Sequence, residues 1–290
     1  MTIDIVSTRL VAADGYVLGG CRFTAQPPLK GRLIVAGATA VPQGYYRRFA
    51  QFAASRGFEV LTFDYRGIGQ SRTGSLKHFR MDLLDWGRLD LAAAVDATAD
   101  PQVPLFIVGH SYGGHAFGLL PNHSKVVGFY VFGTGAGWHG YMPIGERLRV
   151  LTMWNLVLPV LTWWKGYCPW KMLGMGEDLP ADAYRQWRYW CRFPRYFFDD
   201  PAMRGIERGY AEIQTPIVAA NALDDLWALP VSRDAFIQEY RNAPLNRRDL
   251  DPSQVGGKIG HMGYFRQFAE PYWEDALAWF SGLPPKAIEP

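Results

Sequence analysis

The chain has 290 residues, enough for one large hydrophobic core with a subdomain or for two small domains. With 49% hydrophobic and 20% charged residues, its composition is that of an ordinary globular protein. The net charge of +3 comes without any block of lysine and arginine, which argues against a nucleic-acid partner.

Short apolar runs alternate with segments of helical periodicity, which is typical of a mostly parallel sheet covered by helices on both faces. Residues 8–23 differ, because two strands joined at Asp14-Gly15 predict an antiparallel N-terminal hairpin. The later strands are expected at 32–37, 58–65, 104–110, 126–133 and 216–223, with a short one before Gly260. The helices are expected at 45–57, 81–98, 232–240 and 271–282.

The alternation stops between residues 134 and 213. This segment has helical periodicity and lies between two expected strands of the sheet. It contains seven of the eleven tryptophans, namely Trp138, Trp154, Trp163, Trp164, Trp170, Trp187 and Trp190. We therefore expect residues 1–133 and 214–290 to form one α/β core, and residues 134–213 to form a helical lid over one edge of the sheet.

The three cysteines, Cys21, Cys168 and Cys191, cannot all pair with one another, and their spacing fits neither a zinc site nor a disulfide framework. The first residues include acids and no apolar stretch, so no secretory signal is predicted. The most apolar segment, residues 150–164, is too short for a membrane span. We expect a cytoplasmic protein without a transmembrane segment.

The strongest motif is GHSYG at residues 109–113, a G-x-S-x-G pattern that directly follows an apolar strand. Such a pattern is typical of a sharp strand-to-helix turn that raises the serine above the end of the strand. Glycine is needed on both sides because larger side chains would collide. We predict Ser111 as a nucleophile, with the N–H of Tyr112 facing a developing oxyanion. The alternative is a glycine turn with a structural role alone.

A serine nucleophile needs a base, and the base needs an orienting acid. In the fold that carries its nucleophilic serine on such a turn, the order along the chain is serine, acid, histidine. Of the six histidines, His261 alone follows the last expected strand beside a glycine, so it is the expected base, with a surface-loop histidine as the alternative. Asp224 and Asp225 both follow the strand at 216–223. Either suits the acid, and the register favours Asp225.

The loop after the strand at 32–37 is the expected source of a second oxyanion donor. In the sequence AGAT at 36–39 the candidate is the backbone N–H of Ala38, because Gly37 permits a close substrate approach. A tight turn without that role is the alternative. Trp138 and Trp227 are expected to line an apolar substrate pocket. Packing of the lid onto the sheet is the other reading of the tryptophans.

These motifs together resemble the α/β-hydrolase superfamily, and more narrowly hydrolases of unassigned substrate related to the serine aminopeptidase and monoglyceride-lipase branch. The resemblance covers nearly the whole chain. It rests on VPQGYYRRFA (41–50), FDYRGIGQS (63–71), GHSYGG (109–114), GEDLP (176–180), NALDD (221–225) and GHMGYFR (260–266).

By that resemblance, Ser111, Asp225 and His261 are the nucleophile, the acid and the base. The segment Asp64 to Gly67 matches a turn whose role in such proteins is structural. One position departs from the pattern, because Ala36-Gly37 stands where many relatives have His-Gly.

The expected activity is hydrolysis of an ester, thioester or amide through an acyl-enzyme, on an apolar small molecule and without a cofactor or metal. A serine at the strand-to-helix turn disfavours epoxide hydrolysis and dehalogenation, because enzymes for those reactions carry an aspartate at this position. Acyl transfer to an alcohol or amine stays open, because the same residues perform it. A non-catalytic binding protein on this fold is disfavoured, since each triad position has a candidate.

Overall fold

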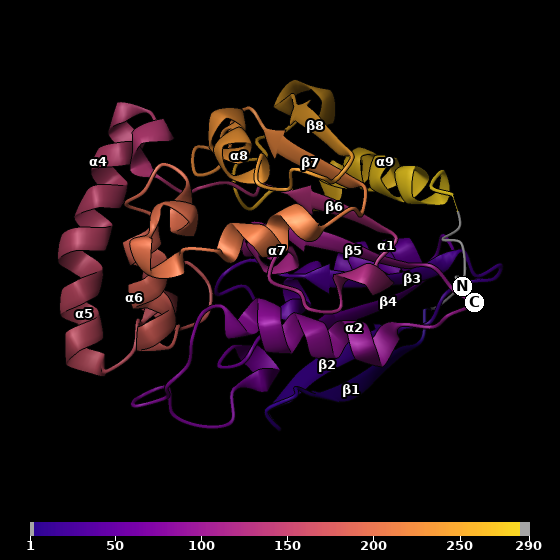
Figure 1. The fold of residues 1–290 in the computed structure, drawn as a ribbon, viewed down its shortest axis with the longest axis horizontal. Helices are drawn as coiled ribbons and strands as arrows, with labels where there is room; N and C mark the ends of the chain where they lie inside the picture. The colour runs from indigo at the N-terminus through magenta and orange to yellow at the C-terminus, as the bar shows by residue number, and fades with distance from the viewer. Residues whose placement is uncertain (1–2, 285–290) are drawn as a thin grey trace.

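The computed structural model describes residues 3–284, in which eight strands form one sheet (Figure 1). The strands are β1 (Ile5–Val11), β2 (Val17–Phe23), β3 (Gly31–Ala36), β4 (Phe58–Phe63), β5 (Leu105–His110), β6 (Gly128–Phe132), β7 (Ile217–Ala222) and β8 (Leu245–Leu250). Their order is β1-β2-β4-β3-β5-β6-β7-β8. The first two pairs are antiparallel and all the others are parallel. The predicted fold class and the N-terminal hairpin are confirmed.

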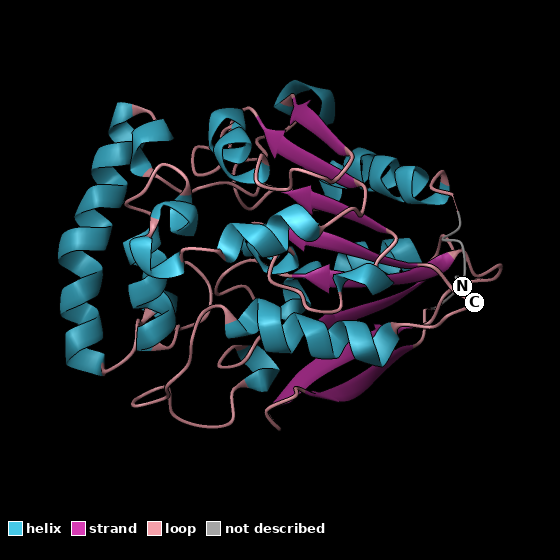
Figure 2. Cartoon of the chain, viewed as in Figure 1, coloured by secondary structure: helices cyan, strands magenta, loops and turns pink. Residues whose placement is uncertain are grey.

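Helices cover both faces of the sheet (Figure 2). They are α1 (Arg47–Ala54), α2 (Ala92–Thr98), α3 (Tyr112–Phe117), α4 (Ile144–Thr152), α5 (Leu158–Lys165), α6 (Ala181–Trp190), α7 (Ile206–Glu212), α8 (Pro230–Ile237) and α9 (Glu270–Ser281). Strand β3 shows how two cores arise. Leu33 and Val35 pack toward α1 and α9, while Ile34 faces α2 and α3. Burial of each of these side chains stabilises the folded state by about 1.5–3 kcal/mol relative to leaving it exposed to water.

The helix expected at 81–98 begins later than predicted. Regular structure starts with a π-helical turn, Trp86–Leu91, and continues into α2. Before that turn, the Asp82 carboxylate accepts the N–H of Leu84 at 2.9 Å, and the Asp85 carboxylate accepts the N–H of Asp82 at 3.1 Å. These local bonds compete with helix formation, as short acidic side chains often do.

The turn after β4 is held by buried polar contacts. The Asp64 carboxylate accepts the N–H groups of Gln43 at 2.6 Å and Gln70 at 2.9 Å. Arg66 forms an ion pair with the fully buried Asp90 at 2.7 Å. These contacts fasten β4 to its neighbouring loops, which agrees with a structural part for this turn.

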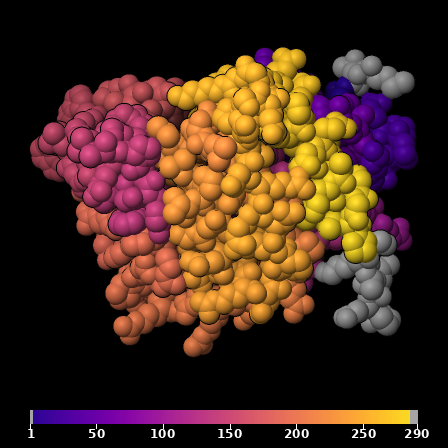
Figure 3. Space-filling view, turned by 90° about the horizontal axis from the view of Figure 1, so that it is seen from above, coloured from indigo at the N-terminus to yellow at the C-terminus, as the bar shows by residue number. Residues whose placement is uncertain are grey.

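Residues 134–213, called the insertion below, contain α4 to α7. A π-helical stretch, Met153–Val157, joins α4 to α5. In Figure 2 the arrowheads of the parallel strands point toward α4, α5 and α6, and Figure 3 shows the insertion as a block at one end of the molecule. Within residues 3–284, the helices all lack the length and apolar character that crossing a membrane requires.

Candidate active site

Ser111 lies at the sharp turn between β5 and α3. Its backbone has φ 52° and ψ −107°, an uncommon conformation for a residue other than glycine. A Cβ on Gly113 would approach the carbonyl oxygen of Ala36 to 2.2 Å, so this position requires glycine for α3 to pack against β3. A Cβ on Gly109 would press on Phe129 at 3.0 Å. The two glycines thus let the chain reverse direction and lift Ser111 above the end of the sheet.

Three side chains from distant parts of the chain meet at this turn. His261 Nε2 lies 3.0 Å from Ser111 Oγ, and His261 Nδ1 lies 2.9 and 3.1 Å from the two oxygens of Asp225. Because a carboxylate accepts hydrogen bonds, Nδ1 carries the ring proton, and Nε2 offers its lone pair to the serine hydroxyl. This is the arrangement in which an imidazole can remove a proton from a serine.

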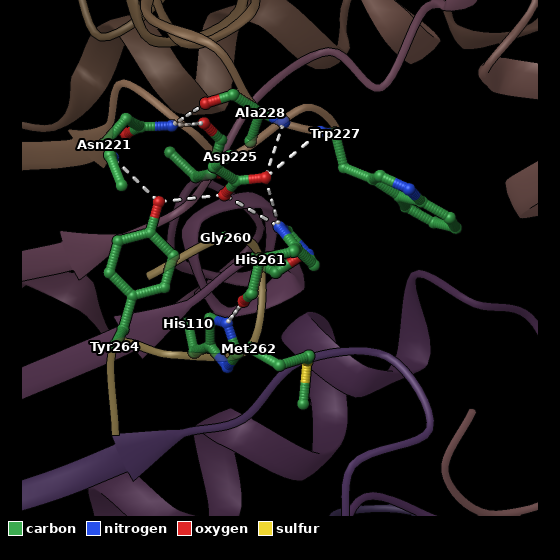
Figure 4. Close-up of polar contacts among 12 residues, drawn as sticks. His110, Asn221, Asp225, Trp227, Ala228, Gly260, His261, Met262 and Tyr264 are labelled. Carbon is green, nitrogen blue, oxygen red and sulfur yellow. Dashed lines mark hydrogen bonds and ion pairs between the residues drawn. The ribbon is translucent and has the colours of Figure 1, made fainter. Parts of the chain in front are cut away.

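Asp225 is fully buried, and each of its oxygens has further donors. Figure 4 shows the donors converging on it: the hydroxyl of Tyr264 at 2.8 Å and the backbone N–H groups of Trp227 and Ala228, both at 3.1 Å. Burial is the largest influence on the pKa of Asp225 and raises it. His261, Tyr264 and the backbone N–H of Ala228 outweigh that influence, so the pKa falls below its usual value.

The neighbouring acid, Asp224, makes different contacts. Its two oxygens accept the backbone N–H groups of Ile259 and Gly260, each at 3.0 Å. Gly260 has φ 50°, a left-handed conformation that suits glycine, and it directly precedes His261. Asp224 therefore fastens the loop that carries the histidine, whereas Asp225 contacts the imidazole ring.

A second histidine, His110, is fully buried and connects this loop with the loop after β3. His110 Nε2 lies 2.9 Å from the backbone oxygen of His261, so it carries the ring proton, and His110 Nδ1 accepts the hydroxyl of Tyr46 at 3.0 Å. The Tyr46 oxygen in turn accepts the N–H of Ala38 at 2.7 Å. Burial, followed by the nearby His261, lowers the pKa of His110 to about 3. The ring therefore stays neutral at pH 7.

The two expected oxyanion donors thus have different surroundings. Tyr112 begins α3, directly after Ser111. Ala38 lines the cavity beside Ser111, but its N–H donates to Tyr46. Two residues further along, the carbonyl of Ala40 accepts the N–H of Glu177 at 2.8 Å, so the insertion is fastened to the same loop.

A cavity of about 520 Å³ adjoins Ser111 and His261. Its wall is largely apolar and includes Val41, Trp170, Met175, Trp187, Leu226 and Trp227. The charged residues Glu146, Arg149, Asp224 and Lys258 also line it. The expected pocket residue Trp227 therefore lies at the cavity, with its ring stacked 5.9 Å from that of His261. Trp138 lies outside the described cavities, because its ring packs against Tyr141 at 4.9 Å.

Sequence reasoning did not single out Tyr46, His110 or Tyr264 as parts of this network. Tyr264 stands three residues after His261 in the motif GHMGYF, and Tyr46 stands in the motif VPQGYYRRFA. These motifs therefore contained a signal. The pairing of Tyr46 with His110 depends on the meeting of β5 with the loop after β3, which only the fold reveals.

An eight-stranded, mostly parallel sheet with a strained serine at the strand-to-helix turn after β5 defines a hydrolase-fold protein. The sequence model of the alpha/beta hydrolase family matches residues 33–265. This match covers most of the chain, so the protein belongs to the alpha/beta hydrolase family.

Solved structures with this fold cover nearly the full chain at low identity. A soluble variant of monoglyceride lipase from Saccharomyces cerevisiae is 16% identical with a TM-score of 0.66, covering 99% of this chain and 97% of that one. A hypothetical protein from Pseudomonas aeruginosa is 14% identical with a TM-score of 0.64, covering 97% and 94%. An esterase from Pyrococcus furiosus is 14% identical with a TM-score of 0.61, covering 96% and 89%. No curated protein matches the chain.

Proposed function

We propose that this hydrolase is a serine hydrolase that cleaves a carboxylic ester, thioester or amide of a small molecule through an acyl-enzyme. One observation carries the proposal. His261 lies within hydrogen-bond distance of Ser111 on one side, at 3.0 Å, and of the buried Asp225 on the other, at 2.9 Å. Such a chain of contacts is what activates a serine at neutral pH.

In the proposed reaction, Ser111 Oγ forms a bond to the substrate carbonyl carbon while its proton passes to His261 Nε2. The tetrahedral intermediate then collapses, the bond to the leaving group breaks, and that group takes the proton from His261. Water attacks the resulting acyl-enzyme with His261 as base, releasing the acid and restoring Ser111. Asp225 holds the imidazole in the required tautomer and stabilises its positive charge.

The proposed oxyanion donors are the backbone N–H groups of Tyr112 and Ala38. Because the Ala38 N–H donates to the Tyr46 hydroxyl, it would have to exchange that partner for the substrate oxygen. The loop in which this exchange takes place is also contacted by Glu177 of the insertion. We assign the insertion the part of a lid, since Trp170, Met175 and Trp187 from it line the large cavity.

A fluorophosphonate probe tests the proposal directly. Intact-mass measurement should show one equivalent of probe on the protein, and peptide mapping should place it on Ser111. The Ser111→Ala variant should take up none. A folded wild-type protein that reacts with neither the probe nor any ester in a panel of p-nitrophenyl substrates would overturn the proposal.

A further inference from the structure

A second, smaller cavity of about 30 Å³ also adjoins Ser111 and His261. It shares Trp187 and Trp227 with the large cavity, so the two spaces meet at the nucleophile. All the residues that line the small cavity are buried or half-buried. The large cavity, in contrast, has the exposed Arg149, Lys258 and Met262 in its wall. A space of 30 Å³ accommodates roughly two non-hydrogen atoms, since a single water needs about 10–15 Å³.

Two side chains in the wall of the small cavity carry buried polar atoms without a protein partner. Tyr196 is fully buried and His115 is 6% exposed, and within residues 3–284 neither Tyr196 Oη nor His115 Nδ1 forms a hydrogen bond. Their rings lie 4.6 Å apart. Leaving a buried polar atom unpaired costs about 1–3 kcal/mol, so two of them in one cavity wall beside Ser111 favour a polar ligand group at that position.

The hydrogen-bonding capacity of this pair is defined. His115 Nε2 lies 2.8 Å from the backbone oxygen of Gly135, so Nε2 carries the ring proton and Nδ1 is an acceptor. Burial lowers the pKa of His115 to about 4, which keeps the ring neutral at pH 7. The Tyr196 hydroxyl both donates and accepts. A ligand group that matches this pair must therefore offer a hydrogen-bond donor. It must also be uncharged, because no acid among residues 3–284 lines the cavity.

Tyr196 also has a backbone conformation that the fold must maintain. Its φ of 59° lies in the left-handed region, which is uncommon for a bulky residue. The tyrosine ring is packed on Trp190 and Phe197, at 5.6 and 4.8 Å between ring centroids. Strain of this kind concentrates at functional sites, where the surrounding structure holds a side chain in a required position.

We propose that the small cavity is the acyl subsite and takes a short hydroxyacyl group, such as glycolyl. This inference rests on the proposed function. The CH₂–OH of a glycolyl group has two non-hydrogen atoms beyond the carbonyl, and its hydroxyl can donate to His115 Nδ1 and accept from Tyr196. The leaving group must depart, which suits the large cavity with its exposed wall. The acyl group remains on Ser111 until water attacks, which suits a closed space.

The test compares matched esters of one alcohol: glycolate, propionate and octanoate. Propionate replaces the hydroxyl of glycolate by a methyl group of similar size. The ratio of kcat/KM for glycolate to that for propionate is measured in wild type and in Tyr196→Phe, which cancels the intrinsic reactivity of each ester. We expect this ratio to fall roughly 5- to 20-fold in Tyr196→Phe, as for the loss of one buried hydrogen bond. Octanoate should be a poor substrate for both proteins.

Tyr65→Phe is the matched control. The Tyr65 hydroxyl is also buried and has no hydrogen-bond partner in the part of the chain that the structure describes. Its ring stacks on Trp86 at 4.9 Å, and the residue lines neither cavity. Removing either hydroxyl leaves no new unpaired group, so both variants should fold. The ester ratio should be unchanged in Tyr65→Phe.

A second variant tests the location independently of the hydroxyl. Cys191 lines the small cavity, and Cys191→Ala enlarges it. We expect the kcat/KM for butyrate relative to propionate to rise severalfold in this variant.

Two results together would overturn the subsite proposal: wild type prefers octanoate, and Tyr196→Phe leaves the ratio of kcat/KM for glycolate to that for propionate unchanged. The small cavity would then hold solvent. Hydrolysis through Ser111 in the same experiment would leave the hydrolase proposal standing. If Ser111 neither takes the probe nor supports hydrolysis, the proposed function fails instead.

Discussion

The central sheet and the insertion bury their apolar side chains to very different extents. Every residue of β5, β6 and β7 is buried. The helices α4 and α5 bury one side, with Val150 and Leu158 inside, and expose the other. Exposed apolar side chains in residues 144–165 include Ile144, Leu148, Leu156, Val160, Trp163 and Trp164, and the two tryptophans are 85% and 65% exposed.

This difference separates two tasks. The proposed reacting groups are fixed by the buried sheet, because Ser111 follows β5, Asp225 follows β7 and the loop of His261 is fastened by Asp224. The insertion supplies apolar wall to the large cavity. The geometry of the proposed reacting groups thus comes from the fully buried strands of the sheet, and part of the wall of the binding space comes from the insertion, whose outer helices are half exposed. Substitutions in the two regions should therefore differ in kind.

The largest effect is expected at Ser111. Ser111→Ala should lower kcat by about 10⁴- to 10⁶-fold because the covalent route is lost, while the fold is retained. Steady-state assays with the best ester of the panel, together with circular dichroism, check this. Ser75→Ala, at an exposed turn, is the control and should match wild type. More than a tenth of wild-type activity in Ser111→Ala would contradict the nucleophile assignment.

Substitutions of the two adjacent acids should have clearly different effects on the kinetics. Asp225→Asn should lower kcat by about 10⁴-fold, because an amide at this position favours the wrong imidazole tautomer. Asp224→Asn should lower kcat/KM only by about 10-fold, since it loosens the loop without touching the ring. The same kinetic assay measures both variants. Equal losses of activity in the two variants would contradict the distinct roles of Asp224 and Asp225.

Acid should destabilise the fold through the two buried histidines of the sheet region. The pKa values of His110 and His115 are about 3 and about 4 when folded, against an ordinary value of 6.5. Below pH 6.5 the unfolded chain therefore binds protons that the folded protein does not. The stability that these residues contribute is complete above pH 6.5 and is lost as pH falls toward 4 and then 3.

Urea unfolding at pH 7 and pH 5 measures this effect. The free energy of unfolding should fall by about 2 kcal/mol for each of these histidines when the pH is lowered from 7 to 5. His115→Gln should remove roughly half of this pH dependence, whatever its stability at pH 7. A variant with the full pH dependence would show that His115 titrates normally in the folded state.

A smaller effect is expected from the insertion wall. Trp187→Ala should raise KM by about 10-fold with a smaller fall in kcat, because it removes apolar contact area from the walls of both cavities but none of the hydrogen bonds to His261. The initial-rate dependence on substrate concentration separates the two constants. A drop in kcat alone would place Trp187 among the groups that act in the chemical step.

The smallest effect is expected at the exposed face of the insertion. Trp163→Ser and Trp164→Ser should each change the free energy of unfolding by less than about 0.5 kcal/mol, since these rings bury little surface. They also serve as controls for Trp187→Ala in the same assays. A large destabilisation would mean that this face is covered in solution.

The strand and motif pattern allowed much of the fold to be predicted, because buried parallel strands such as β5 and β7 are continuous apolar runs bounded by turns. The edge strand β8, LNRRDL, was expected only as a short strand before Gly260. Its charged side chains suit an exposed edge and conceal its strand character.

The site shows the same limit. The elbow motif pointed to Ser111, and the order of elements pointed to His261 and to the acid pair. The different contacts of Asp224 and Asp225, and the engagement of the Ala38 N–H by Tyr46, depend on side-chain directions at loop ends. Local sequence does not determine those directions, because residues from three separate segments set them together.

The imidazoles of His110 and His261 lie with ring centroids 5.5 Å apart, and they are chemically unequal. His110 is sealed into the interior with both nitrogens engaged, so it does not become a second cation when its neighbour is protonated. A full positive charge on each ring at that separation would repel. In the proposed reaction, a neutral His110 therefore does not oppose the transfer of the Ser111 proton to His261.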